Sequence, residues 1–143
     1  MGETAGWQRR VEGFVLDQIR DLPAGILEVG CGKGELAVAL DRAGHSVTAI
    51  DPRAPEGPIF RRVGIGEFFE PGPFDHVVAI LSLHHVKDIS GALDKMAGLL
   101  RAGGTLVVVE FAWKRTPPSP GRRARWRFPS CRLSSIQRRP SVK

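Results

Sequence analysis

A glycine-rich turn constrains the fold of this chain more than any other feature. Residues 30–34 read Gly-Cys-Gly-Lys-Gly, after an apolar run at 25–29 and before a helical pattern with Leu36, Ala37 and Leu40 on one face. Glycine adopts positive φ without strain and lets other atoms approach its backbone closely. This spacing is therefore typical of a tight turn that joins a buried strand to a helix.

The rest of the chain repeats this alternation of strands and helices. Apolar runs and helical periodicity predict strands at 46–50, 59–63, 74–81 and 105–109, and helices at 6–20 and from 89 to the glycines at 103–104. The prolines of the segment 52–58 disfavour a crossover helix there. Alternating strands and helices indicate a parallel sheet wound by right-handed crossovers. We therefore predict an α/β fold with a doubly wound, mainly parallel sheet.

Charge divides the chain into two parts. Of the 21 Lys and Arg residues, ten lie in 114–143, which has no Asp or Glu, so residues 1–113 hold 11 basic and 15 acidic residues and a net charge of −4. Residues 114–143 are also rich in Pro, Arg and Ser, a composition that favours disorder over a packed core. The prediction is a folded domain at 1–113 and a disordered basic tail at 114–143.

The composition also bears on the compartment. The two cysteines, Cys31 and Cys131, match neither a disulfide framework nor a zinc site. No apolar run reaches the roughly 18–20 residues that span a bilayer. The first ten residues lack the basic and apolar regions of a secretory signal. We expect a cytoplasmic protein with no membrane partner.

An acidic residue completes the glycine pattern. Asp51 ends the strand predicted at 46–50, about 20 residues past the first glycine, where a carboxylate can accept both hydroxyls of a ribose. A dinucleotide fingerprint would need glycine where the chain has Glu35, whose carboxylate would face a pyrophosphate at the helix N-terminus. This disfavours NAD and FAD. The alternative is a plain glycine turn with Asp51 as a strand end.

Taken in order, these motifs resemble a known family. Residues 26–111 are similar to the class I S-adenosylmethionine-dependent methyltransferases, of the small-molecule type often called methyltransferase type 11. The matching segments are 26–34 (Ile-Leu-Glu-Val-Gly-Cys-Gly-Lys-Gly), 47–51, 74–79, 83–86 and 100–106. The resemblance implies a Rossmann-like fold, S-adenosylmethionine as cofactor and methyl transfer to a small-molecule acceptor.

The resemblance also implies a cofactor site. Glu28 would orient the methionine end of the cofactor, the loop backbone would underlie it, and Asp51 would hold the ribose. Gly66 and Glu67 would lie at the adenine, and Ile80 and Leu81 beside the methyl donor. The whole implied set is Glu28, Gly30, Cys31, Gly32, Gly34, Asp51, Pro52, Gly66, Glu67, Ile80 and Leu81.

The catalytic residues are left unassigned. His84 and His85 follow the fourth predicted strand, where an imidazole could act as a general base or could simply hydrogen-bond a loop. No neighbouring His, Cys or carboxylate set completes a metal site with them. We expect Cys31 to fill space rather than act as a nucleophile, Asp75 to fix the start of its strand, and Glu110 to lie at the pocket rim.

The C-terminal part departs from the family. The family continues after the fifth strand with a helix and two antiparallel strands, one of which covers the edge of the fifth. The composition of 114–143 does not match them, so we expect a core truncated after the fifth strand, with an open edge that favours self-association. Three functions stay open: a small-molecule methyltransferase, a cofactor-binding remnant with a misframed or alternatively spliced tail, and a nucleic-acid-associated methyltransferase that uses the basic tail.

Overall fold

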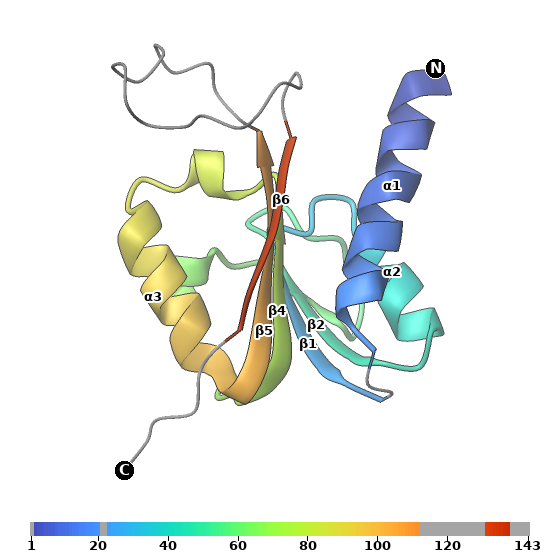
Figure 1. The fold of residues 1–143 in the computed structure, drawn as a ribbon. Coiled ribbons are helices and arrows are strands. Elements are labelled where there is room, and N and C mark those ends of the chain that lie inside the picture. The colour runs from blue at the N-terminus through green and yellow to red at the C-terminus, as the bar shows by residue number, and fades with distance from the viewer. Residues whose placement is uncertain (1, 21–22, 112–130, 138–143) are drawn as a thin grey trace, which may run out of the picture.

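The computed structural model describes the backbone of residues 2–20, 23–111 and 131–137 (Figure 1). Three α-helices, two short 3-10 helices and six strands make up this part of the chain. In chain order they are α1 (Gly2–Gln18), β1 (Gly25–Val29), α2 (Glu35–Arg42), β2 (Ser46–Ile50), β3 (Phe60–Arg61), η1 (Ile65–Glu67), β4 (Phe74–Ile80), η2 (Leu83–His85), α3 (Ile89–Leu99), β5 (Leu100–Phe111) and β6 (Cys131–Gln137).

The six strands form one sheet in the order β3-β2-β1-β4-β5-β6. The first five run parallel, and only β6 is antiparallel to its neighbour. Helices α1 and α2 cover one face of this sheet and α3 covers the other (Figure 1). The predicted α/β, Rossmann-like fold with a mainly parallel sheet is therefore confirmed.

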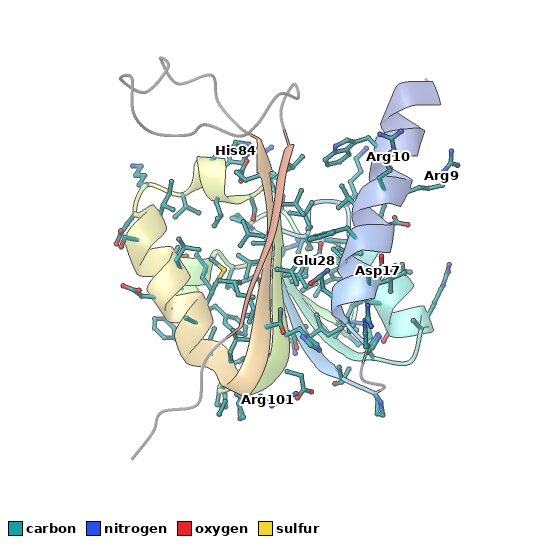
Figure 2. The ribbon with its side chains drawn as sticks, in the orientation of Figure 1. Arg9, Arg10, Asp17, Glu28, His84 and Arg101 are labelled. Atoms are coloured by element: carbon teal, nitrogen blue, oxygen red, sulfur yellow. The ribbon has the colours of Figure 1, made fainter. Side chains whose placement is uncertain are left out.

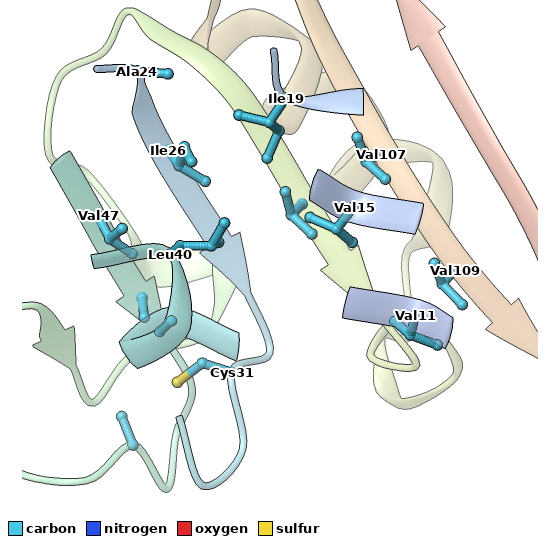
Figure 3. Packing of buried hydrophobic residues seen from close by; sticks show 14 residues of the cluster. Val11, Val15, Ile19, Ala24, Ile26, Cys31, Leu40, Val47, Val107 and Val109 are labelled. Atoms are coloured by element: carbon cyan, nitrogen blue, oxygen red, sulfur yellow. The ribbon is translucent and has the colours of Figure 1, made fainter. Parts of the chain in front are cut away.

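Helix α1 packs through a single apolar stripe. Val11, Val15 and Ile19 are 6%, 0% and 5% exposed and follow one another at the i, i+4 spacing that places side chains on one helix face. In Figure 3 these residues lie against Val107 and Val109 of β5, in one buried cluster. The stripe predicted from periodicity is thus a core-facing one, and it fixes the helix over the sheet.

The opposite face is covered by α3, which begins as predicted but ends earlier. The Asp88 side chain caps the helix by accepting a hydrogen bond from the Gly91 amide (Oδ1···N 2.9 Å). We predicted that Gly103 and Gly104 would end it, and this is wrong. The helix ends at Leu99, because Leu100 is buried and pairs with Phe74 as the first residue of β5.

Two weaker predictions concern segments before β4. The strand expected at 59–63 is shortened to Phe60–Arg61, which pairs with Ala49 and Ile50 of β2. No helix is found between β2 and β3, in agreement with the prolines of that segment.

Within the described residues, no helix is long and apolar enough to cross a membrane.

Asp75 ties the start of the sheet together. One carboxylate oxygen accepts a hydrogen bond from the Gly25 amide at 2.6 Å, and the other contacts the Arg101 Nε at 2.5 Å. These contacts link the first residues of β1 and β4 with the start of β5. The expected role of Asp75 at the start of its strand is therefore confirmed.

Strand β6 corrects the expectation of an open sheet edge. Residues 131–137, assigned from the sequence to a disordered tail, pair with residues 105–111 of β5 in an antiparallel ladder. Composition disfavoured a strand there, but backbone pairing along an existing strand needs no apolar core of its own. The edge of β5 is thus covered within the chain, as one C-terminal strand covers it in the resembling family. Association through an open β5 edge loses its structural basis.

This pairing predicts how truncation affects association. A chain that ends after Ser130 exposes the N–H and C=O groups of β5, and we expect it to form oligomers or aggregates. A chain that ends after Gln137 keeps β6 and serves as the control. Light scattering after size-exclusion chromatography distinguishes the two. A shorter chain as monodisperse as the longer one would show that β6 does not protect this edge.

Candidate functional site

The carboxyl ends of β1, β2 and β4 meet where the order of the sheet reverses. Strand β1 pairs with β2 on one side and with β4 on the other. The chain adds β2 and β3 on one side of β1 and then returns to add β4 and β5 on the other side. In open parallel sheets this position leaves a crevice outside the strand ends, where ligands bind. The glycine loop at 30–34 lies at this position, between β1 and α2.

The loop is tied directly to the end of β2. The amides of Gly30 and Cys31 donate to the carbonyl oxygen of Ile50, at 2.8 and 3.0 Å. The amide of Gly32 donates to Asp51 Oδ2 at 3.1 Å, while Asp51 Oδ1 accepts from the amide of Arg53 at 2.7 Å. The two halves of the sequence pattern, the glycines and Asp51, are therefore in contact.

The three glycines of the loop have different roles, although all have positive φ (77°, 54° and 83°). A Cβ on Gly30 would lie 2.2 Å from the Cβ of Ser82, whose hydroxyl donates to the Val29 carbonyl at 2.9 Å. A Cβ on Gly34 would lie 2.5 Å from the Phe60 ring. A Cβ on Gly32 would meet nothing within 4 Å. Gly30 and Gly34 thus permit close packing, and Gly32 faces open space.

Two adjoining cavities open at this edge of the sheet. The α1 cavity, of about 440 Å³, lies beside α1, and the β2 cavity, of about 1220 Å³, lies beyond the end of β2. The α1 cavity is lined by the predicted residues Glu28, Gly30, Cys31, Gly32, Asp51, Ile80 and Leu81. The β2 cavity is lined by the predicted residues Gly30, Gly32, Asp51, Pro52, Gly66 and Glu67. Of the implied set, Gly34 alone lines neither cavity.

Glu28 is a buried carboxylate at the wall of the α1 cavity. Its side chain is 3% exposed and lies between the sheet and α1 (Figure 2). Its Oε2 has no hydrogen-bond partner among the described residues. Burial, and then the nearby charge of Asp51, raise the pKa of Glu28 to about 7. A hydrogen bond from the Ala37 backbone lowers this pKa in part. A buried carboxylate oxygen without a partner is costly unless a ligand group meets it, so Glu28 fits a cationic or hydrogen-bond-donating ligand.

Two further residues complete the wall beside β4 and the loop. Cys31 is 8% exposed, and burial and the charges of Glu28 and Asp51 raise its pKa to about 12. The thiol is therefore protonated near neutral pH, as expected for a space-filling residue rather than a nucleophile. Leu81, at the end of β4, has a φ of 48°, a strained conformation for a side chain of its size.

The two histidines are held differently. His84 Nδ1 lies 2.9 Å from Glu110 Oε1, and Glu110 Oε2 accepts the amide of Leu83 at 3.1 Å. The His85 ring lies against that of His84, with centroids 4.0 Å apart and the ring planes tilted by 46°. His85 lines both cavities, whereas His84 and Glu110 line neither. No group of three metal-ligand side chains is found in the part of the chain that the structure describes.

The resemblance implied that the N-terminal helix contributes to acceptor binding, but sequence reasoning assigned none of its residues to the site. Trp7, Gln8, Val11 and Glu12 line the α1 cavity from the helix side, and Gln8 Nε2 donates to the carboxylate of Glu35. The periodicity of 6–20 identified the buried stripe of this helix. It gave no signal for Gln8 and Glu12, which lie beside that stripe, because their position over the loop depends on how α1 crosses the sheet.

Comparison with known proteins identifies the family. Residues 5–142 match the profile of the methyltransferase domain family. The chain belongs to this family. It is 38% identical over 102 residues to an uncharacterised methyltransferase of Mycobacterium tuberculosis, covering 60% of this chain and 50% of that protein. It is 35% identical over 114 residues to a ubiquinone biosynthesis O-methyltransferase of Methylocella silvestris, covering 68% and 44%. The chain thus spans about half the length of these relatives.

Solved structures support the same fold for this methyltransferase domain. The Burkholderia thailandensis 1,6-didemethyltoxoflavin-N1-methyltransferase, determined with S-adenosylhomocysteine, is 27% identical, with a TM-score of 0.55 over 64% of this chain and 47% of that one. The N-methyltransferase NodS of Bradyrhizobium japonicum aligns over 94% and 98% of the two chains with a TM-score of 0.67. At 17% identity, the second shows the fold alone.

The loop geometry predicts a contrast between two glycine substitutions. Gly30→Ala forces a Cβ onto Ser82 in addition to its positive φ, so we expect it to destabilise the domain by about 3 kcal/mol or more. Gly32→Ala meets no neighbour and carries only the left-handed backbone cost, about 1–2 kcal/mol. Urea unfolding of both variants measures this difference. Equal losses of unfolding free energy would show that the Gly30–Ser82 approach relaxes freely.

Proposed function

We propose that this methyltransferase domain binds S-adenosylmethionine at the glycine loop and transfers its methyl group to a small-molecule acceptor. The observation that carries the proposal is the buried carboxylate of Glu28, with one oxygen unpaired, beside a loop tied to Asp51. The named activities of the relatives support it, and the toxoflavin methyltransferase contains the demethylated cofactor in its structure. Because this chain spans about half of the curated relatives, the activity is a proposal for this chain.

The two cavities fit the two ends of the cofactor. We assign the adenosine to the β2 cavity, with Asp51 at the ribose hydroxyls and Gly66 and Glu67 at the adenine. The methionine end then lies in the α1 cavity, where Glu28 accepts its ammonium group. Five residues line both cavities, Gly30, Gly32, Asp51, Ser82 and His85, so one elongated ligand can cross between them.

The chain's own residues would act mainly by alignment. When bound, the cofactor supplies a methyl group already activated by its sulfonium. Ile80 and Leu81 at the end of β4 restrict where the acceptor can lie, and α1 closes the opposite side of the cavity. Holding reacting groups at near-attack geometry contributes about 7–11 kcal/mol in well-oriented systems. His85, which lines both cavities, can accept a proton from acceptors that must lose one.

The role of Asp51 is tested by binding of S-adenosylhomocysteine. Replacing Asp51 with Ala removes the proposed acceptor of the ribose hydroxyls, and we expect affinity to fall about 10- to 100-fold, as for lost hydrogen bonds to a charged group. Isothermal titration calorimetry measures this affinity. The matched control is Asp41→Ala, at an exposed position of α2. Unchanged affinity in the folded Asp51 variant, or no binding by the folded natural chain, would contradict the assignment.

The raised pKa of Glu28 predicts a pH dependence of the same binding reaction. In the free chain the carboxyl is largely protonated below its pKa of about 7, and a cofactor ammonium favours the ionised form. Binding should therefore release a proton, and affinity should rise about tenfold per pH unit up to about pH 7 and then level off. Titration calorimetry in two buffers of different ionisation enthalpy measures the proton release. We expect Glu28→Gln to abolish it; a release that persists in this variant would assign it to another group.

Turnover separates methyl transfer from binding alone. Transfer of labelled methyl groups from S-adenosylmethionine to a metabolite pool supports the enzyme, whereas binding without transfer supports a cofactor-binding remnant. The nucleic-acid alternative rests on the basic residues of 114–143, and the structure describes only 131–137 of that segment. Binding of RNA or DNA that falls steeply with salt and disappears on removal of 114–143 would support it.

A further inference from the structure

The two cavities differ in the charges that line them. The α1 cavity has four carboxylates and neither Lys nor Arg among its lining residues, the acids being Glu12, Glu28, Glu35 and Asp51. The β2 cavity is lined by Lys33, Arg53 and Lys87 as well as by Asp51 and Glu67. Acidic side chains are therefore concentrated at the end of the site that lies under α1.

The cofactor accounts for only part of this acidity. Under the proposed function, Glu28 and Asp51 at the sheet edge contact the cofactor. Asp51 is further occupied by two backbone amides, at 3.1 and 2.7 Å. Glu12 and Glu35 come instead from the covering helices α1 and α2. Gln8, one turn before Glu12, holds the Glu35 carboxylate by a hydrogen bond. Two carboxylates thus remain on the side of the cavity away from the sheet.

An aromatic and apolar wall lies beside these carboxylates. Trp7 and Val11, spaced i, i+4 on α1, line the cavity together with Leu36 of α2. Trp7 is half-buried, packs against the core cluster and also lines the cavity. An indole face beside carboxylates is the combination that attracts an organic cation, through the ring quadrupole and through direct charge. The same carboxylates repel an acceptor that carries an acidic group.

From this charge distribution we propose that the methyl acceptor is a small aromatic or apolar amine, bound in the α1 cavity with its nitrogen near Glu12 and its apolar part against Trp7. Because the unpaired oxygen of Glu28 is assigned to the ammonium group of the cofactor, the acceptor preference rests on Glu12, Glu35 and Trp7. The proposal rests on the function proposed above, because it places the acceptor beside the methionine end of the cofactor.

The transfer step follows from the chemistry of an amine. The amine reaches the site as an ammonium ion and loses one proton, to water or to the imidazole of His85, before it reacts. Its nitrogen lone pair then forms the new N–C bond while the S–C bond of the sulfonium breaks. The sulfur keeps that electron pair and becomes a neutral thioether. The methylated product leaves as an ammonium ion.

A matched set of ligands tests the preference. Titration calorimetry of the chain saturated with S-adenosylhomocysteine is carried out with tyramine, 4-ethylphenol and 3-(4-hydroxyphenyl)propionate, which share a phenol ring and carry an amine, no charge and a carboxylate. We expect tyramine to bind about tenfold more tightly than 4-ethylphenol, and the carboxylate to bind most weakly. Equal affinities, tighter binding of the carboxylate, or no binding of tyramine would overturn the proposal.

Two variants assign the preference to the cavity. Glu12→Gln keeps the shape of the side chain, and we expect it to weaken tyramine binding about five- to tenfold while 4-ethylphenol is unaffected. Asp17→Asn makes the same charge change on an exposed part of α1 that lines neither cavity, and should change nothing. Equal effects of the two variants would overturn the role of Glu12. Failure of S-adenosylhomocysteine itself to bind would instead overturn the proposed function, and the acceptor proposal with it.

Discussion

The close approach of one loop to two strand ends organises this domain. Gly30 comes so near to Ser82 that no side chain fits between them, and the next amides bond to the carbonyl of Ile50 and the carboxylate of Asp51. Strands β1, β2 and β4 therefore end in one fixed arrangement. The backbone of Gly32 remains open toward solvent at its centre. Both cavities form around this point, so the site depends on contacts among main-chain atoms more than on any catalytic side chain.

The carboxylates of the α1 cavity come from two places, the edge of the sheet and the helices that cover it. Glu28 is held in a place where burial disfavours its charge, and such a placement persists in a folded protein only if the surrounding packing compensates for it. Because folding raises the pKa of Glu28 from 4.5 to about 7, the free energy of unfolding falls as the pH rises through this range. An ordinary paired carboxylate has the opposite pH dependence. The helices add two more carboxylates and the indole of Trp7 to the lining of the α1 cavity.

Membership of the methyltransferase family narrows the chemistry without fixing it. One fold can host unrelated chemistries, so function is argued from the residues of the site and not from the fold. In this chain, the proposals on function rest on Glu28, on the contact between Asp51 and the glycine loop, and on the acidic cavity under α1.

Much of the fold was predictable from local pattern. Continuous apolar runs located β1, β2 and β4, because these strands are largely buried on both faces. Helical periodicity located α1, because burial of one helix face imposes that spacing. The glycine spacing and Asp51 located the loop. The sequence could not predict that Leu100 begins a strand, that 131–137 pairs with β5, or that Gln8 and Glu12 face the loop. Strand partners and helix crossing are set by contacts between segments distant in sequence, which no local period encodes. The sequence by itself determined most of the elements and the glycine–aspartate pair, and only the tertiary structure decided how β5 and β6 pair and which side chains share a cavity.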